Sequence, residues 1–164
     1  HDGFDCVIRT GALPEDGVIA RPLGKLTMVN CASPHYLTRF GYPQSPDDLT
    51  SHAIVRYTPH LGVHPLGFEV ASVNGVQWFK SGGMLTVNSS ENYLAAGLAG
   101  LGIIQIPRIA VREALRAGRL IEVLPGYRAE PLSLSLVYPQ RRELSRRVNL
   151  FMQWLAGVMK EHLD

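Results

Sequence analysis

The stretch that most constrains the fold runs from Thr86 to Pro107, TVNSSENYLAAGLAGLGIIQIP. A strand end, a helix and a strand start follow one another in it with almost no spacer. Asn88 or Ser89 is placed to cap the helix, and Glu91 follows Asn88 by three residues, from where its carboxylate can reach back to the cap amide. The start of this helix is therefore expected to present free N–H groups.

The body of the same helix is apolar nearly all round, which predicts a buried helix. Its apolar residues are Tyr93, Leu94, Ala95, Ala96, Leu98, Ala99 and Leu101. Gly97, Gly100 and Gly102 allow close packing and end the helix, and a short strand follows from Ile103 to Ile106. A helix start that opens at the carboxyl end of a strand predicts a site for a small anion or polar ligand.

The composition is that of a globular protein with one medium domain or two small lobes. The chain has 164 residues, of which 46% are hydrophobic and 18% charged. Its net charge of +2 is too small to indicate nucleic-acid binding. We find no signal peptide and no segment long enough to span a membrane. The absence of an initiating Met before His1 suggests a part of a longer protein.

Cys6 and Cys31 each lie in an apolar, strand-like run and are predicted to be buried thiols in a reducing cytoplasm. A redox-sensing pair is the alternative, and it requires the two residues to come within bridging distance.

The order of elements predicts an α/β chain with mostly parallel sheets and one antiparallel hairpin. The expected strands are 4–8 (a buried strand), 18–24, 26–32, 53–57, 68–73, 76–80, 84–87, 103–106, 120–124 and 132–138. The expected helices are 34–40, a helical turn after Ser45, the helix after Ser89, 108–117 and 143–163. Asn74-Gly75 predicts a hairpin with a primed turn. The last helix is amphipathic, with Leu144, Val148, Phe151, Leu155, Val158 and Met159 on its apolar face.

No set of residues indicates catalysis, a metal or a cofactor. His60 and His64 lack a third ligand, and nothing near Cys31 and His35 would orient the imidazole of a nucleophile–base pair. The glycines after the helix are not at a strand-to-helix turn, so they form no dinucleotide cradle. The cluster of Arg141, Arg142, Arg146 and Arg147 is interpreted as a solvated helix face, with a phosphate-contacting patch as the alternative.

Several strand ends and helix starts remain as candidate site residues, each of which could instead be a structural cap or turn. They are Arg9, Thr10, Gly11, Cys31, Ala32, Ser33, Asn88, Ser89, Ile106 and Pro107.

The chain closely resembles the effector-binding domain of LysR-type transcriptional regulators over nearly all its length. The resemblance rests on an ordered set of motifs: a strand ending in IR-x-G, an LG…CASP-x-YL segment, P-x-x-P-x-DL-x-x-H, and then TVNSSENYLAAGLAGLGIIQIP and LIEVLPGYRAEPLSLSLVYP before a closing helix. Each motif is weak alone, but their order is specific.

The resemblance implies two Rossmann-like lobes of the type II periplasmic-binding-protein kind, with an effector cleft between them. It assigns residues 1–21 and 132–164 to lobe one and 22–131 to lobe two, and it places the candidate site residues in the cleft. It further implies a cytoplasmic homodimer or homotetramer that binds no membrane and contacts DNA only through an N-terminal winged helix-turn-helix absent from this chain. The helix after Ser89 is expected to serve dimer contacts, as its counterpart does in the family.

Lobe one is incomplete compared with the family, because its first strand-helix-strand is not in the chain. We therefore expect this lobe to be rearranged or completed by another chain, since a sheet without a central strand leaves backbone groups unpaired. A solute-binding protein of a transport system is the alternative function on the same fold. The effector, the target genes and the sign of regulation do not follow from the sequence.

Overall fold

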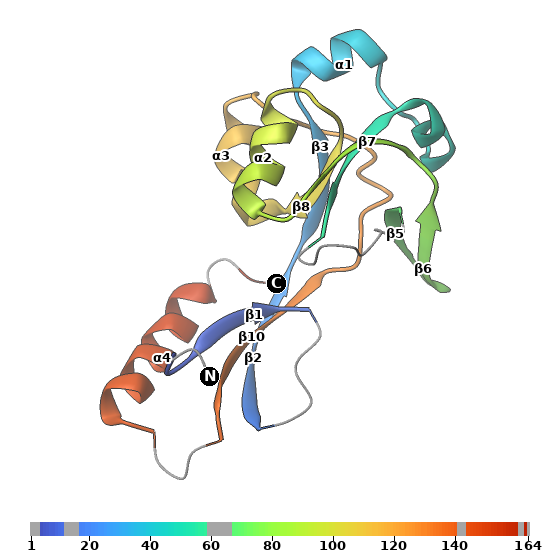
Figure 1. Ribbon diagram of the computed structural model, residues 1–164. Helices are drawn as coiled ribbons and strands as arrows, with labels where there is room; N and C mark the ends of the chain where they lie inside the picture. Colours follow the sequence, from blue (N-terminus) through green and yellow to red (C-terminus); the bar gives the residue numbers. More distant parts are fainter. Residues whose placement is uncertain (1–3, 12–16, 59–66, 141–143, 161–162, 164) are drawn as a thin grey trace. The chain divides into compact units, whose positions relative to one another are not determined.

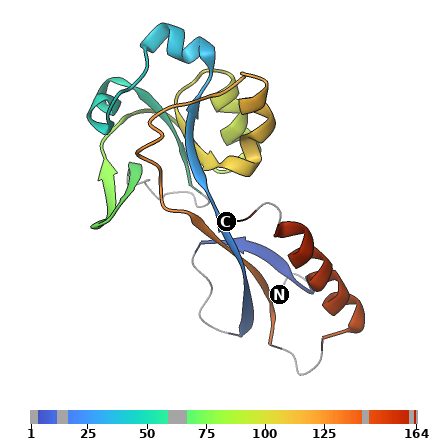
Figure 2. The same ribbon diagram turned by 180° about the vertical axis from the view of Figure 1, so that it is seen from behind.

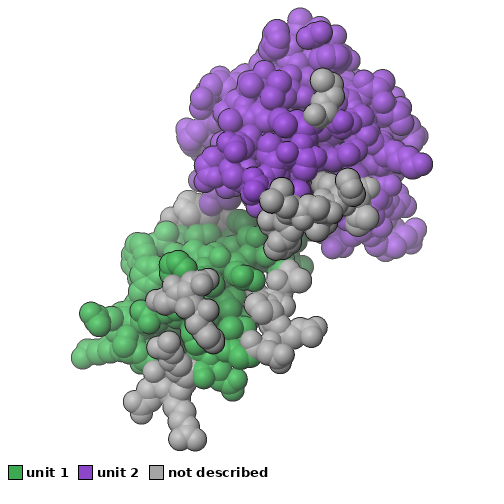
Figure 3. All heavy atoms as spheres, viewed as in Figure 1, with its two compact units in different colours: residues 1–27, 131–164 green, residues 28–130 purple. Residues whose placement is uncertain are grey.

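The chain forms two compact units (Figure 3). The structure, a computed structural model, describes residues 4–11, 17–58, 67–140, 144–160 and 163 (Figure 1). Unit 1 comprises residues 1–27 and 131–164, and unit 2 comprises residues 28–130. The chain therefore passes between the units twice, after Thr27 and after Glu130. The assignment of these units to the lobes of an effector-binding domain stays a prediction.

Unit 1 is a three-stranded antiparallel sheet covered by one helix (Figures 1 and 2). Its elements are β1 (Val7–Thr10), β2 (Val18–Leu26), β10 (Leu132–Pro139) and α4 (Arg146–Met159), with sheet order β1-β10-β2. Leu136 of the central strand packs against Met152 and Leu155 of the helix. This small cluster is the core of the unit.

Two expectations for unit 1 were wrong in detail. The first strand is not buried, because β1 is an edge strand and three of its four residues are exposed, with Ile8 at 48%. The apolar face predicted for the last helix also differs. Met152 and Leu155 are buried, whereas Phe151 and Val158 are 47% and 40% exposed. A single layer of three strands is too narrow to cover a full apolar face of the helix.

Unit 2 holds the remaining elements. They are β3 (Met28–Ala32), α1 (Pro34–Phe40), a 3₁₀ helix η1 (Pro46–Ser51), β4 (Ala53–Tyr57), β5 (Phe68–Ser72), β6 (Gly75–Phe79), β7 (Gly82–Val87), α2 (Ser90–Leu98), β8 (Ile104–Pro107), α3 (Arg108–Arg116) and β9 (Ile121–Glu122). The strands pair as β8-β3-β9, β4-β7 and β5-β6. Two backbone hydrogen bonds between Ile103 and β4 join the first two groups into one layer.

Successive side chains along each strand point to opposite faces of the sheet, and each face has its own core cluster. Val29, Cys31 and Val55 pack on one side with α2 and α3, which lie side by side in Figure 1. Ala32 and Ile54 pack on the other side with α1, η1 and β5, where Phe68 is fully buried. The predicted caps of α1 are confirmed, because Ser33 Oγ accepts from the Tyr36 amide at 3.2 Å and Gly41 ends the helix with φ +82°.

The expectation of mostly parallel sheets was wrong. Five of the six strand pairings between the described strands are antiparallel; β4 and β7 run parallel, as does the isolated bridge between Ile54 and Ile103. The alternation of strands and helices shows how many elements exist but not which of them pair. Here β3 pairs with β8 and β9, and β10 returns between β1 and β2. Such long-range pairing decides the strand direction.

The hairpin at Asn74-Gly75 is confirmed, but its turn is not of the primed kind. Strands β5 and β6 pair antiparallel, with Ser72 opposite Gly75. A primed type I turn needs positive φ at both central residues. Among the described residues of this turn only Gly75 has a positive φ, +103°. The conformational freedom of glycine is therefore used just after the turn.

Helix α2 is buried on one face only, in contrast to the expectation from its apolar composition. Tyr93, Ala96 and Gly97 are buried, whereas Ala95 and Ala99 are exposed. A Cβ on Gly97 would lie 2.6 Å from Ile104 Cδ1, so the glycine allows close contact between α2 and β8. The small size of the alanines makes the rest of the helix apolar without requiring burial.

We predict that the stability of unit 2 falls at mildly acidic pH through His52. This side chain is 5% exposed, and its Nδ1 lies 3.0 Å from the Tyr36 hydroxyl. Burial lowers the pKa of His52, and nearby Asp48 only partly opposes this. The unfolded chain therefore binds the proton more readily, so stability present above the ordinary histidine pKa of about 6.5 is lost as the pH falls through that value.

Urea unfolding checks this prediction. The urea concentration at the unfolding midpoint should decrease when the pH is lowered from about 7.5 to about 5.5. This decrease should be smaller in a His52→Gln variant. An identical pH dependence in both proteins would contradict the assignment to His52.

Candidate functional site

A pocket of about 250 Å³ in unit 2 is the strongest candidate for a binding site. Its lining residues come from β3, β4, β5, β6, β8 and α2 and from the segments next to β5 and β10. Its lining is Met28, Ile54, Val55, Arg56, Tyr57, Gly67, Glu69, Trp78, Tyr93, Gln105 and Ala129. The wall is thus largely apolar and aromatic with a few polar groups, which is the usual make-up of a small-molecule site.

A hydrogen-bond network built on Gln105 holds one wall of the pocket in place. Gln105 Nε2 donates to Asn30 Oδ1 at 2.9 Å and to the Glu69 carbonyl at 2.8 Å, and its Oε1 accepts from the Glu69 amide at 2.9 Å. Asn30, which is 0% exposed, donates in turn to the carbonyls of Leu124 and Tyr127 at 3.2 and 2.9 Å. A network satisfied in this way is rigid, so the wall is preorganised.

Two tyrosines form the adjacent wall. The rings of Tyr57 and Tyr93 lie 5.7 Å apart, and the Tyr93 hydroxyl accepts from the Gln105 amide at 2.9 Å. Burial raises the pKa of Tyr93 well above its ordinary value, so the hydroxyl remains protonated. Tyr93 therefore acts here as a neutral hydrogen-bonding group.

The start of α2 differs from the predicted capping box. Ser89 is the cap, with its Oγ accepting from the Asn92 amide at 3.1 Å, and Glu91 accepts the Ser89 hydroxyl at 3.1 Å. Hydrogen bonds from its own amide and from Ser89 lower the pKa of Glu91. This carboxylate places negative charge at the helix start, which weakens the expected preference of that start for an anion.

The predicted site residues in unit 2 do not all come together. Cys31 lies opposite Ile104, whereas Met28, three residues earlier on β3, lies opposite Pro107. The two ends of this pairing are therefore about 10 Å apart. Ser33 lies beside Gly100 beyond the end of α2, while Ser89 caps the start of this helix, which is about 13 Å long.

Exposure also divides these residues. Cys31 and Ala32 are 0% exposed and Ser33 3%, whereas Asn88 is exposed and Ser89 half-buried. Arg9, Thr10 and Gly11 belong to unit 1, where β1 ends at Thr10 and the Gly11 amide donates to the Ser133 carbonyl at 3.0 Å. A common ligand site formed by these groups stays a prediction.

None of the predicted site residues lines the unit 2 pocket, although two are close to its wall. Ile106 follows Gln105 in the chain, and Pro107 pairs with Met28. Arg56 and Tyr57 at the carboxyl end of β4 were not predicted as site residues from the sequence. The same pattern that indicated the other strand ends, polar residues directly after an apolar strand, is present there. Arg56 and Tyr57 follow the buried Ile54 and Val55.

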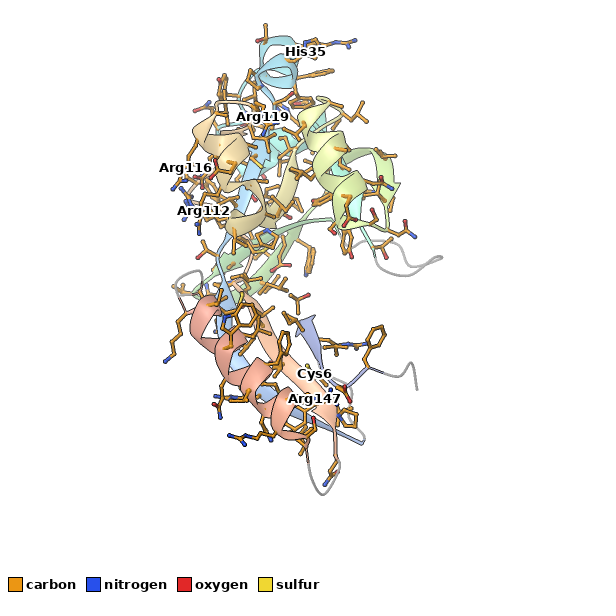
Figure 4. The ribbon with its side chains drawn as sticks, turned by 90° about the vertical axis from the view of Figure 1, so that its left-hand side faces the viewer. Cys6, His35, Arg112, Arg116, Arg119 and Arg147 are labelled. Atoms are coloured by element: carbon orange, nitrogen blue, oxygen red, sulfur yellow. The ribbon has the colours of Figure 1, made fainter. Side chains whose placement is uncertain are left out.

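Unit 1 contains a second pocket, of about 420 Å³. It is lined by Asp5, Cys6, Ser145, Arg147, Val148 and Phe151. Figure 4 shows Cys6 and Arg147 at this place. Arg146 and Arg147 begin α4, whereas Arg141 and Arg142 of the predicted basic cluster lie outside the described residues.

The described residues give little support for a redox-active or metal-binding site. Burial raises the pKa of the Cys31 thiol to about 12, with a smaller contribution from Glu122, so little reactive thiolate forms. Cys6 and Cys31 are free thiols and belong to different units. The described residues contain no group of three potential metal ligands, and His60 and His64 lie outside them. No helix in the described ranges is long and apolar enough to cross a membrane.

Comparison with curated proteins relates the chain to transcriptional regulators. It is 99% identical over 164 residues to the HTH-type transcriptional regulator YhjC of Escherichia coli K12, covering 55% of that protein. It is 34% identical to an HTH-type transcriptional repressor of Pseudomonas aeruginosa and 32% identical to the HTH-type transcriptional activator AaeR of Escherichia coli, covering 51% of each. The chain thus spans about half the length of these relatives, which are named as regulators and not as enzymes.

Comparison with solved structures and with protein families leads to the same group. The regulatory domain of CrgA, a LysR-type transcriptional regulator from Neisseria meningitidis, superposes with a TM-score of 0.80 at 26% identity, over 94% of this chain and 74% of that one. The fold class implied by the resemblance is therefore confirmed. Residues 1–160 match the LysR substrate binding domain family. The chain belongs to this family and is a regulatory domain of the LysR-type transcriptional regulators.

Proposed function

We propose that the chain binds a small metabolite and that this binding changes the lobe and dimer geometry of a cytoplasmic, homodimeric or homotetrameric DNA-binding regulator. In this proposal the DNA is contacted only by a helix-turn-helix outside the chain. The observation that carries the proposal is the preorganised pocket of unit 2 in a chain of the LysR substrate binding domain family. The ligand shifts a conformational equilibrium by binding one state more tightly than the other.

Family membership disfavours the alternative of a transport solute-binding protein, because the relatives reported above are named as transcriptional regulators. They include both a repressor and an activator, so the sign of regulation is open to experiment.

The proposal is tested with the full-length relative YhjC. A panel of neutral, cationic and anionic metabolites is screened for a rise in melting temperature, and each ligand found is then added to the protein bound to its operator DNA. We expect at least one ligand both to stabilise the protein and to change the DNA affinity or the footprint. A panel in which no compound does so would refute the proposal.

Ser89 does not line the unit 2 pocket, so contact between the effector and the start of α2 is a separate proposal, which Ser89→Trp tests. The bulky side chain should abolish the ligand-induced thermal shift while the protein remains folded, since loss of the cap costs only about 1 kcal/mol. Ser145→Trp is the matched control, because Ser145 Oγ caps α4 in the same way, accepting from the Val148 amide at 3.3 Å. If the ligand-induced thermal shift is unchanged in Ser89→Trp, Ser89 does not contact the ligand. If the shift is lost only in Ser145→Trp, the ligand binds in the pocket of unit 1, which Ser145 lines.

A further inference from the structure

Arg56 is the one cationic side chain among the described residues that line the unit 2 pocket. It lies near the carboxyl end of β4, and its Nη2 donates to the Ser81 carbonyl at 3.0 Å. No carboxylate of the described residues forms an ion pair with it. The guanidinium is therefore anchored by a neutral group and keeps its full charge for another partner.

Two buried polar atoms at this place lack a hydrogen-bond partner, Arg56 Nε and Ser81 Oγ. Buried polar groups in folded proteins are nearly always paired, so each exception calls for an explanation. Both atoms belong to the two residues that the Nη2 hydrogen bond already joins. Both unpartnered atoms are closed to solvent, so an anion in the pocket would pair with the Nη groups of the guanidinium and balance its charge.

Gly83 on the neighbouring strand makes room for the guanidinium. Gly83 lies opposite Ile54 where the register of β4 and β7 shifts, and a Cβ built on it would lie 2.6 Å from Arg56 Cζ. The glycine thus permits a close approach of the guanidinium to the backbone. The position of the charged group depends on the absence of a side chain there.

The other lining residues indicate what kind of group the ligand carries besides its anionic group. Trp78 is 47% exposed and Tyr57 44%, so both present free aromatic surface, and Met28 and Ile54 add aliphatic surface. Glu69 is the one acidic residue in the described part of the lining, and its carboxylate already accepts from the Glu130 amide at 3.0 Å. The pocket therefore offers one positive group beside an apolar and aromatic wall.

We propose that Arg56 is the anion-recognising residue of this pocket and that the effector is a small monocarboxylate with an apolar or aromatic body. This inference rests on the proposed function and narrows it to a ligand class. The carboxylate pairs with the guanidinium, and the body packs against Trp78 and Tyr57. The pocket volume of about 250 Å³ limits the ligand to a small molecule.

The test measures binding of acetate, hexanoate, benzoate and phenylacetate at constant ionic strength by titration calorimetry. Each acid is compared with its own primary amide, which has nearly the same shape but no charge. Measurements use both this chain and full-length YhjC. We expect at least one acid to bind, with its amide binding about tenfold to hundredfold more weakly, because the amide lacks the negative charge and has a donor in place of one acceptor oxygen.

Three variants separate the charge from the position of the guanidinium. Arg56→Gln should lose about tenfold to hundredfold in affinity for the acid, and Arg56→Lys should recover part of the loss. Gly83→Ala keeps the charge but displaces the guanidinium, so the affinity should fall while the unfolding midpoint changes little, because the clash is with the end of a flexible side chain. Far-UV circular dichroism confirms that each variant is folded.

Several results would overturn the inference. They are equal binding of acid and amide, unchanged affinity in Arg56→Gln, and the absence of binding by every acid. If neutral or cationic metabolites bind in the broader screen while the acids do not, the inference fails and the proposed function stands. If no metabolite of any class binds, both fail.

Discussion

Replacing Asn30 with alanine is expected to lower the free energy of unfolding by about 2–4 kcal/mol, since it leaves buried groups without partners. Asn30 is 0% exposed, and its side chain joins Gln105 to the carbonyls of Leu124 and Tyr127. Those carbonyls belong to a turn in which Leu124 adopts a φ of +48°, a conformation that non-glycine residues rarely take. Asn30 therefore holds both a strained turn and the pocket wall.

Urea unfolding followed by circular dichroism measures this effect. Asn149→Ala is the matched control, because the Asn149 amide donates to the Leu144 carbonyl at 3.4 Å on an exposed part of α4. The control should change stability by less than about 0.5 kcal/mol. A similarly small effect of Asn30→Ala would show that the buried network contributes little to the fold.

Replacing Gly102 with alanine is expected to destabilise unit 2 by about 3 kcal/mol, because the new Cβ would overlap a neighbouring backbone. That Cβ would lie 2.6 Å from the Ala53 carbonyl oxygen and 3.2 Å from the Val55 nitrogen. These are the β4 groups that hydrogen-bond to Ile103, at 2.9 and 3.0 Å, and that join β4 to the β8 side of the sheet. Relief of the clash therefore has to weaken these bonds.

Gly126→Ala is the control for this substitution. A Cβ on Gly126 would meet nothing within 4 Å, so stability should change by less than about 0.5 kcal/mol. Thermal and urea unfolding of both variants measure the difference. Equal stability of the two variants would mean that the junction between Ile103 and β4 tolerates a side chain.

Local features of the fold were predictable because they depend on residues close in the chain. A serine before a helix caps it through its own neighbouring amides, as Ser33 and Ser89 both do. The stop at Gly41 and the hairpin at Asn74-Gly75 likewise follow from the backbone preferences of one or two residues. The ordered motifs identified the family, which the match over residues 1–160 confirms.

The pocket was harder to predict because its wall is assembled from distant segments. Asn30 and Gln105 are 75 residues apart in the chain, and Glu69 and Gln105 are 36 apart. Nothing in the sequence around Arg56 shows that its guanidinium would lie against Gly83 or that no carboxylate of the described ranges would pair with it. The parallel or antiparallel direction of the strands could not be predicted for the same reason, since β10 pairs with strands more than a hundred residues earlier in the chain.

The sequence alone therefore determined the family, the turn positions, the cap of α1 and a start of α2 at Asn88 or Ser89, because each depends on local chemistry or on an ordered set of motifs. Only the tertiary structure decided which strands pair, that Ser33 is buried beside Gly100 beyond the end of α2, and that Arg56 lines a pocket. The physical reason is that burial and pairing arise from contacts between segments far apart in the chain, and residue patterns within one segment do not specify those contacts.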